Sequence, residues 1–318
     1  MTNQKIPFDL LELQKILTIL NNNTWFPIEL ADIVQSYISF NDETIRDAII
    51  SWKNDRAKCE KINGHISSWI VSKVTDMSKL FSDITNFNED LSLWDVSNVQ
   101  NMRSMFNGCK IFNQDLSLWN VFKVCDMSSM FEHCENFNKK LSSWDVSNVQ
   151  NMSSMFKGCK NFNQDLSLWN TSNVQNMSSM FYACYSFNKD LSLWNVSNVV
   201  YMGSMFHNCI NFNQNLNPWN VSNVKRTSSM FYNCVNFNQD LSSWNVSNII
   251  NMEFMFGHCI KFDQDLSSWN VSKVVSMSWM FYECTTFNKD LNSWNVSNVE
   301  FMQNMFENCE MFNQDLSS

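Results

Sequence analysis

Eleven cysteines and four histidines are the residues of this chain best suited to redox chemistry or metal binding. Nine of the cysteines, from Cys109 to Cys309, recur at a fixed interval of 25 residues. Zinc-binding cysteines usually lie about two to four residues apart, and on a helix His133 and His258 would point away from the cysteines that follow them. Nine equivalent cysteines cannot all pair with one another. The spacing therefore favours a column of buried free thiols, packed as small apolar side chains in a reducing compartment, over a metal site or a disulfide framework.

Asparagine and aspartate form two further columns at the same interval. The first column comprises Asn88, Asn113, Asn138, Asn163, Asn188, Asn213, Asn238, Asp263, Asn288 and Asn313. Because stacked amides can hydrogen-bond the backbone of the next repeat, this column predicts an internal asparagine ladder. The second column comprises Asp90, Asp115, Asp165, Asp190, Asp240, Asp265, Asp290 and Asp315, and is interrupted by Lys140 and Asn215. Calcium-binding repeats need glycine-rich turns, and the chain has 5 glycines, so a solvated or turn-capping face is favoured over a site for a cation or a basic partner.

Six Asn-X-Ser sites also follow the repeat, and they would accept glycans in a eukaryotic secretory pathway. Their asparagines are Asn170, Asn195, Asn220, Asn245, Asn270 and Asn295. Asp95 and Asp145 occupy the same position of the repeat, so a turn explains it better than glycosylation does. The repeats contain no glycine-rich phosphate loop, nucleophile elbow or acid and base pair. We therefore predict no catalytic residue, no cofactor and no metal, and we expect that the chain is not an enzyme.

The element that positions these columns is a repeat of 25 residues without insertion or deletion. Tryptophan marks it at Trp69, Trp94, Trp119, Trp144, Trp169, Trp194, Trp219, Trp244, Trp269 and Trp294. In one unit, the apolar residues from Met152 to Phe162 follow one another at steps of three, one, three and three, which is typical of one face of a helix of about two turns. A short strand is predicted near Leu141 to Val146. Each unit is therefore predicted to be a strand, a turn and a helix.

One such unit cannot bury enough apolar surface to fold alone, whereas about three stacked units can. The pattern W-[DN]-V-S-N-V-x-x-M-S-x-M-F-x-x-C-x-x-F-N-Q-D-L-S-x-W, carried by residues 144–169 among others, resembles the BspA-like repeat family. This family is related to the leucine-rich repeats and occurs in bacterial surface lipoproteins, large DNA viruses and protists. The predicted fold class is an α/β repeat, a leucine-rich-repeat-like solenoid of about ten units over residues 64–318.

Residues 1–63 do not follow the repeat and are predicted to form a helical cap, with helices over about 10–20, 27–38 and 42–62, the last ended by Gly64. The first repeat departs from the others at Leu80 and Ile84, as expected beside a cap. Residues 26–38 also resemble the opening of an F-box, whose pattern is met by Pro27, Glu29, Leu30, Ile33 and Tyr37. The resemblance implies that Pro27, Leu30, Ile33 and Tyr37 dock on the adaptor subunit of a cullin-type ubiquitin ligase. Both interpretations, a cap and a docking module, stay open.

The positions that vary between repeats are the candidates for binding a partner, because the invariant ones are needed for stacking. In the C-terminal half they hold Tyr182, Tyr185, Tyr201, Tyr232, Phe254, Trp279, Tyr282 and Phe301. Three of these tyrosines share one position and are two units apart. This alternation fits an aromatic interaction surface, and it fits equally well the duplication of a two-repeat block.

The net charge of −9 and the sequence pI near 4.9 leave no basic surface for nucleic acid. No apolar run approaches the roughly 18 residues of a membrane span, and no secretion signal is evident at the N-terminus. We therefore expect a cytoplasmic protein, in the host cytoplasm if the source is viral. Its expected function is a non-enzymatic protein–protein interaction solenoid that binds a protein partner, and an intracellular adaptor if the F-box-like segment docks. The alternative is a cell-surface or structural adhesin-type repeat protein.

Overall fold

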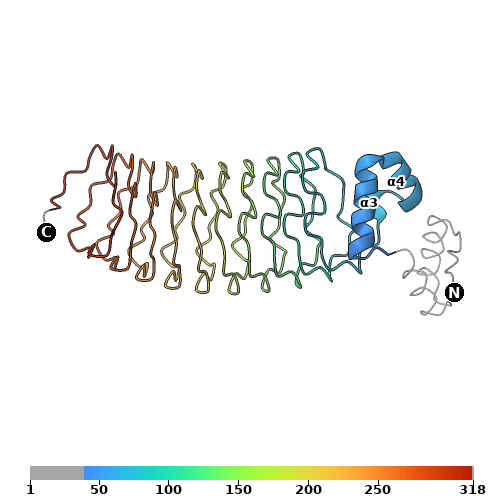
Figure 1. Ribbon diagram of the computed structural model, residues 1–318, viewed down its shortest axis with the longest axis horizontal. Coiled ribbons are helices and arrows are strands. Elements are labelled where there is room, and N and C mark those ends of the chain that lie inside the picture. Colours follow the sequence, from blue (N-terminus) through green and yellow to red (C-terminus); the bar gives the residue numbers. More distant parts are fainter. Residues whose placement is uncertain (1–38, 317–318) are drawn as a thin grey trace.

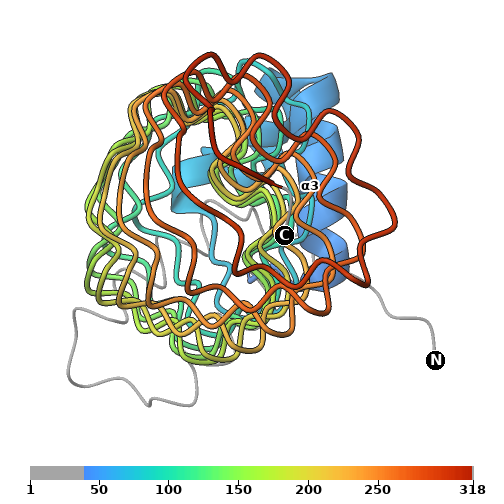
Figure 2. The same ribbon diagram turned by 90° about the vertical axis from the view of Figure 1, so that its left-hand side faces the viewer.

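The computed structural model describes residues 39–316, in which the repeats form one elongated stack with two helices at one end (Figure 1). The helices are α3 (Asp42–Asn54) and α4 (Arg56–Asn63), followed by a short 3-10 helix, η1 (Ile66–Ser68). The helices predicted over residues 10–20 and 27–38 lie outside the described residues. From Trp69 onward the chain completes one circuit around the long axis every 25 residues, and Figure 2 shows these circuits overlying one another. We call each circuit a rung, which begins at a tryptophan.

Each rung consists of consecutive tight turns. In the rung of residues 144–168, the N–H groups of Met155, Lys157, Cys159 and Phe162 each donate to the carbonyl oxygen three residues earlier. The helix predicted for each repeat is therefore wrong, since an α-helix needs bonds to the fourth residue back. Ser154 has a φ of 57°, which reverses the backbone and prevents a helix. Apolar residues at steps of three fit such turns as well as they fit a helix.

Adjacent rungs are joined by backbone hydrogen bonds that alternate with these turns. The N–H groups of Met152, Ser154, Phe156 and Gly158 donate to carbonyl oxygens 24 residues further along the chain, at 2.7–3.0 Å. Parallel pairing is confined to single residues, in nine isolated bridges between Asp76 and Phe301. The strand predicted near Leu141 to Val146 is wrong, because the Trp144 N–H closes a turn on the Leu141 carbonyl at 3.1 Å.

The core consists of columns of identical side chains. Trp119 and Trp144 stack with their ring centroids 6.4 Å apart and their planes 2° apart, and Phe131 and Phe156 stack at 5.8 Å. The Trp169 side chain is 3% exposed, and its indole N–H donates to the Leu141 carbonyl at 2.9 Å. The fixed interval thus buries large aromatic rings while satisfying the polar atom of each tryptophan.

The cap helices begin and end at residues suited to those positions. The Asn41 side chain accepts the N–H of Thr44 at 2.9 Å at the start of α3. Gly64, with a φ of 72°, follows α4 as predicted. The single helix predicted over 42–62 is wrong in one respect, because it is interrupted at Asp55, whose carboxylate caps α4 by accepting the Lys58 N–H at 3.0 Å.

Helix α3 lies where a preceding rung would be, and two of its side chains make hydrogen bonds to the first rung that a preceding rung makes elsewhere in the stack. The Asp42 carboxylate accepts the backbone N–H groups of Thr75 at 2.7 Å and Asp76 at 3.0 Å. The Arg46 guanidinium donates to the carbonyl oxygens of Asp76 at 3.3 Å and Ser78 at 2.8 Å. In later rungs the equivalent groups bond to the preceding rung. These two residues, one helical turn apart, therefore supply both acceptors and donors to the first rung at Thr75, Asp76 and Ser78.

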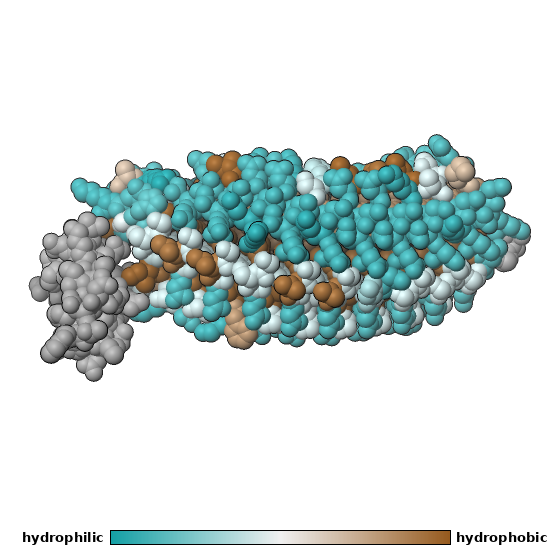
Figure 3. All heavy atoms as spheres, turned by 180° about the vertical axis from the view of Figure 1, so that it is seen from behind, coloured by the Kyte–Doolittle hydropathy of each residue, from teal (hydrophilic) through white to brown (hydrophobic). Residues whose placement is uncertain are grey.

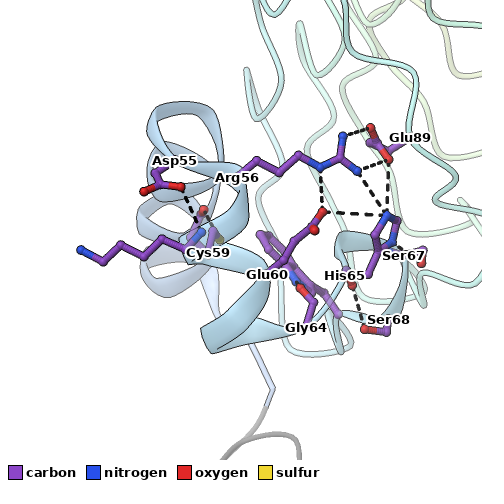
Figure 4. A network of polar contacts seen from close by, with 12 residues as sticks. Asp55, Arg56, Cys59, Glu60, Gly64, His65, Ser67, Ser68 and Glu89 are labelled. Carbon is purple, nitrogen blue, oxygen red and sulfur yellow. Dashed lines mark hydrogen bonds and ion pairs between the residues drawn. The ribbon is translucent and has the colours of Figure 1, made fainter.

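A cluster of charged groups holds α4 to the first rung (Figure 4). The Arg56 guanidinium lies 2.7 Å from a carboxylate oxygen of Glu60 and 2.7 Å from one of Glu89. His65 Nε2 lies 3.6 Å from the other Glu89 oxygen. Since Glu89 belongs to the repeats and Glu60 to α4, Arg56 joins the two parts. Neither α3 nor α4 has the length and apolar character of a membrane-crossing helix.

Candidate protein-binding surface

Side chains 25 residues apart lie above one another in columns, so a change in one repeat alters the surface of one rung only. The column of Ser154 holds serine in six rungs, at Ser104, Ser129, Ser154, Ser179, Ser204 and Ser229. Phe254 and Trp279 take the place of serine in the next two rungs. The columns of Lys157 and Gly158, which follow in the same tight turns, also vary from rung to rung. These three columns carry the largest cluster of half-buried aromatic side chains outside the core of residues 39–316.

We call this cluster the aromatic strip. It comprises Tyr182, His207, Tyr232, Phe254, His258, Trp279 and Tyr282. The strip spans the five rungs that begin at Trp169 to Trp269. The structure therefore brings together five of the eight predicted partner-binding residues.

The N-terminal part of the strip is a stack of parallel rings. The His207 imidazole lies between Tyr182, at a centroid distance of 4.3 Å, and Tyr232, at 4.7 Å. Desolvation lowers the pKa of His207 to about 4, so its ring is neutral at pH 7. The Lys157 ammonium lies 5.8 Å from the Tyr182 ring centroid and 2.9 Å from the Glu132 carboxylate. The stack thus ends in a cation over an aromatic face.

The C-terminal part of the strip contains two bulky residues with unusual backbone geometry. Phe254 has a φ of 54° and Trp279 a φ of 61°, in the left-handed region that costs an L-residue about 1–2 kcal/mol. Their rings stack at a centroid distance of 5.6 Å, and Trp279 meets Tyr282 edge to face at 5.1 Å. Serine fills this position in most other rungs, so the fold does not require aromatic rings there. Bulky residues at positive φ are a sign of a functional position.

A glycine makes room for the strip where it changes direction. A Cβ atom on Gly257 would lie 2.9 Å from the Tyr232 ring, closer than side-chain atoms pack. Without it, the Tyr232 ring reaches Phe254 at 5.8 Å and His258 at 5.1 Å, edge to face in both cases. Because Gly257 has no side chain, Tyr232 can contact both the ring stack of the first three rungs and the cluster of the last two.

Glu283 provides a polar edge to the strip. Its carboxylate lies 2.8 Å from His258 Nδ1, and its hydrogen bond with Tyr282 raises the pKa of the Tyr282 hydroxyl to about 12. Tyr282 therefore stays protonated at neutral pH and acts as a hydrogen-bond donor. The surface combines apolar rings with fixed polar groups, the composition typical of binding hot spots.

Three predicted partner-binding residues lie outside the strip. Tyr185, Tyr201 and Phe301 are 38%, 45% and 47% exposed, and they belong to other columns. Phe301 lines a shallow groove with Ile250 and Val275. The candidate docking residues Pro27, Leu30, Ile33 and Tyr37 lie outside the described residues.

Two members of the strip, His207 and His258, were not predicted as binding residues. His207 occupies the same position of the repeat as Tyr182 and Tyr232, in the rung between them. The signal was therefore present in the alignment of the repeats, but it is missed when only tyrosine, phenylalanine and tryptophan are considered.

The cysteine column is buried, as predicted, from Cys109 to Cys284 and half-buried at Cys309, and all eleven cysteines are free thiols. Burial raises the pKa of Cys109 to about 12. The nine column thiols also have a polar role that was not predicted, because each donates to the phenylalanine carbonyl of the preceding rung, as Cys159 does to Phe131 at 3.0 Å. Ile84 replaces cysteine in the first repeat, where no preceding rung supplies that carbonyl. Cys125 lies outside the column and is exposed.

The polar columns stabilise turns and join rungs. The Asn88 side chain accepts the backbone N–H of Asn113 at 2.9 Å, which confirms the predicted ladder, although its members are exposed or half-buried and not internal. Asp115 accepts the N–H of Ser117 at 2.9 Å, so the predicted turn-capping role is confirmed. The Asn-X-Ser position has a turn role too, since Asn170 accepts the Ser172 N–H at 3.2 Å. Across residues 39–316, no three histidine, cysteine or acidic side chains gather closely enough to hold a metal ion.

A family model described as "Mycoplasma protein of unknown function, DUF285" matches the chain three times, over residues 50–166, 129–241 and 208–318. The matches overlap and together include every rung and the whole aromatic strip. They are consistent with the resemblance to BspA-like repeats, and the F-box-like residues 26–38 lie outside all three. The comparison with curated proteins gives no match.

Proposed function

The chain belongs to the DUF285 family, and from this premise we propose that it is a non-enzymatic repeat protein whose stack binds another protein through the aromatic strip. We further propose that the stack is a solenoid of the leucine-rich-repeat type. The rungs form a rigid support, and the strip is the part of that support in which residue types depart most from the repeat.

The observation that carries the proposal is the pair Phe254 and Trp279. Both rings occupy a position of positive φ, which is unusual for a bulky residue, and six other rungs have serine there, so the fold does not require aromatic rings at this position. Both are half-buried; Phe254 meets Tyr232 edge to face, and Trp279 meets Tyr282 edge to face. Retaining costly aromatic residues on a surface is expected where those residues bind a partner.

The test exploits the serine found at this position in other rungs. Wild-type protein and the variant Phe254→Ser/Trp279→Ser would be used to capture partners from an extract of the source cells. Tyr185→Ser, which removes an exposed aromatic ring outside the strip, is the matched control. We expect one protein to be recovered with wild type and Tyr185→Ser, and at least tenfold less of it with the double variant. Equal recovery with all three proteins would exclude the strip as the binding surface.

An adaptor role is the finer form of this proposal. Under it, Pro27, Leu30, Ile33 and Tyr37 dock on a ubiquitin-ligase adaptor subunit while the strip holds a second protein, in the cytoplasm. The free thiols of residues 39–316 favour a reducing compartment. Leu30→Asp should abolish co-purification of the ligase subunit and leave the melting temperature unchanged. Unfolding of this variant, with no ligase subunit bound to wild type, would instead assign these residues to a cap.

The alternative proposal is an adhesin-type surface protein. It requires export, and exported protein would carry glycans at sites such as Asn170-Thr171-Ser172 or oxidised thiols. Mass spectrometry of protein from the source cells distinguishes the two proposals, because unglycosylated protein with free thiols is expected only for the intracellular one.

A further inference from the structure

A second surface, distinct from the aromatic strip, projects from the N-terminal half of the stack. Leu93, Leu118, Leu168 and Leu193 occupy one column, and their side chains are 80%, 78%, 78% and 73% exposed. We call these four residues the leucine ridge. Figure 3 shows a broken row of hydrophobic residues along this half of the stack. In the sequence the column is interrupted by Ser143, which takes the position of leucine in the middle rung.

The fold itself favours serine in this column. The hydroxyl of Ser143 donates to the Ser117 carbonyl of the preceding rung at 2.7 Å. Ser268 and Ser293 make the equivalent bonds at 2.9 and 2.6 Å. A leucine forgoes this bond and exposes almost its whole side chain to water, an unfavourable arrangement for the free chain. The four leucines are therefore explained by contact with something outside the stack, since they contribute little inside it.

Carboxylates accompany the leucines. Each leucine of the ridge follows an aspartate by three residues, namely Asp90, Asp115, Asp165 and Asp190. Lys140 takes the place of the aspartate before Ser143, whereas the aspartates continue beside the serines of later rungs, at Asp240, Asp265 and Asp290. Hydrogen bonds from Ser117 and Ser167 lower the pKa of Asp115 and Asp165, so both are ionised at neutral pH. Lys139 and Lys189, near these two aspartates, offset part of this charge, and Asp95 and Asp145 add to it just beyond the ridge.

We propose that the leucine ridge and its aspartates bind a basic amphipathic helix of a partner protein, with its apolar side on the leucines and its lysines or arginines on the carboxylates. Rungs joined by parallel bridges are about 4.8 Å apart, and an α-helix rises about 5.4 Å per turn. A helix lying along the stack would therefore meet about one rung per turn. A second copy of this chain would bring aspartates against aspartates, and an anionic membrane would meet the same repulsion.

The experiment measures binding of two labelled 18-residue helical peptides to the full chain by fluorescence anisotropy. One peptide has a leucine stripe flanked by lysines, and the other has the same stripe flanked by glutamates. The ridge variant is Leu93→Ser/Leu118→Ser/Leu168→Ser/Leu193→Ser, which restores the serine of other rungs. The matched control is Ile111→Ser/Ile210→Ser/Ile250→Ser/Ile260→Ser, which removes four exposed apolar side chains in other columns.

We expect the lysine peptide to bind wild type and the control with the same Kd, and the ridge variant at least tenfold more weakly. Asp115→Asn/Asp165→Asn should weaken binding and reduce its salt dependence. An equal Kd for wild type and the ridge variant, or equally tight binding of the glutamate peptide, would overturn the proposal. So would light scattering that shows a dimer lost in the ridge variant, or ridge-dependent sedimentation with phosphatidylcholine vesicles, because the occupant would then be a second copy or a lipid surface. Melting temperatures unchanged by the serine substitutions would confirm that the fold does not need the ridge.

Discussion

The Asp42 carboxylate accepts the Thr75 backbone N–H at 2.7 Å, in the place where every later rung uses a carbonyl of the preceding rung. Asp42→Ala should therefore lower the free energy of unfolding by about 1–2 kcal/mol, because two backbone N–H groups lose their acceptor. Asp42→Asn keeps one oxygen and should cost less. Amide exchange of Thr75 and Asp76 should accelerate locally. Asp47→Ala, an exposed aspartate of the same helix, is the control, and an equal effect there would contradict the capping role.

The accessible thiol is expected to be Cys125. Its side chain is exposed, whereas burial raises the pKa values of the column cysteines, that of Cys309 to about 11. A thiol reagent at pH 8 should label Cys125 within minutes and the buried cysteines from Cys109 to Cys284 at least a hundredfold more slowly, because reaction needs an accessible thiolate. Peptide mapping identifies the labelled site. Cys125→Ser should remove the fast phase, and eleven thiols should react after denaturation. Rapid labelling of Cys159 in folded protein would contradict the buried column.

Trp169→Ala should destabilise the chain by about 3–5 kcal/mol, because it leaves a large cavity in the core and frees the Leu141 carbonyl. Tyr185→Ala, at an exposed aromatic ring, should cost about 0.5 kcal/mol or less. Chemical denaturation followed by circular dichroism measures both. A larger effect at Tyr185 would mean that the core and surface columns have been exchanged.

Removal of one whole repeat, residues 144–168, should leave a folded and shorter stack. The new junction places Trp169 where Trp144 was, so every column continues with equivalent neighbours. We expect the melting temperature to change by only a few degrees. Removal of residues 144–155, about half a repeat, should abolish cooperative melting, because apolar positions then face water. Similar melting curves for the two deletions would exclude a stack with a 25-residue period.

Acid should weaken the ring stack around His207. The folded pKa of about 4 lies below the value of about 6.5 in an unfolded chain, so the unfolded chain binds the proton more readily. The contribution of His207 is therefore complete above pH 6.5 and is lost as the pH falls toward 4. Between pH 7 and pH 4.5, the melting temperature should fall further for wild type than for His207→Phe. His133→Asn, at an exposed histidine, should follow wild type, and identical profiles for all three proteins would refute this role.

The interval of the tryptophans was sufficient to predict which residues are buried, because every repeat places the same side chain in the same environment. It was not sufficient to predict the backbone. Apolar steps of three are shared by a helix and by a series of tight turns, and serine at positions such as Ser154 gives no sign of a positive φ. The local elements were therefore wrong although the buried columns were right.

For the candidate site, the aromatic residue types indicated which repeats carry the strip, but the position of each residue within its repeat decides whether it belongs to the strip. Tyr182 and Tyr232 were predicted correctly to share a column, but Tyr201 and Phe301 lie at a different distance from their tryptophans and face another part of the surface. Only the number of residues after the tryptophan tells which column a side chain joins. Counting in this way would also have placed His207 between the two tyrosines.

The direction of the hydrogen bonds between rungs has a consequence for how the chain is assembled. Most of the N–H groups that bond between rungs donate to carbonyls that come 24 residues later, while α3 already bonds to the first rung from its other side. During synthesis on the ribosome, α3 emerges before the rungs and can nucleate the folding of the first one. Each newly translated rung then packs on rungs that are already ordered, so we expect folding to advance from α3 toward the last rung.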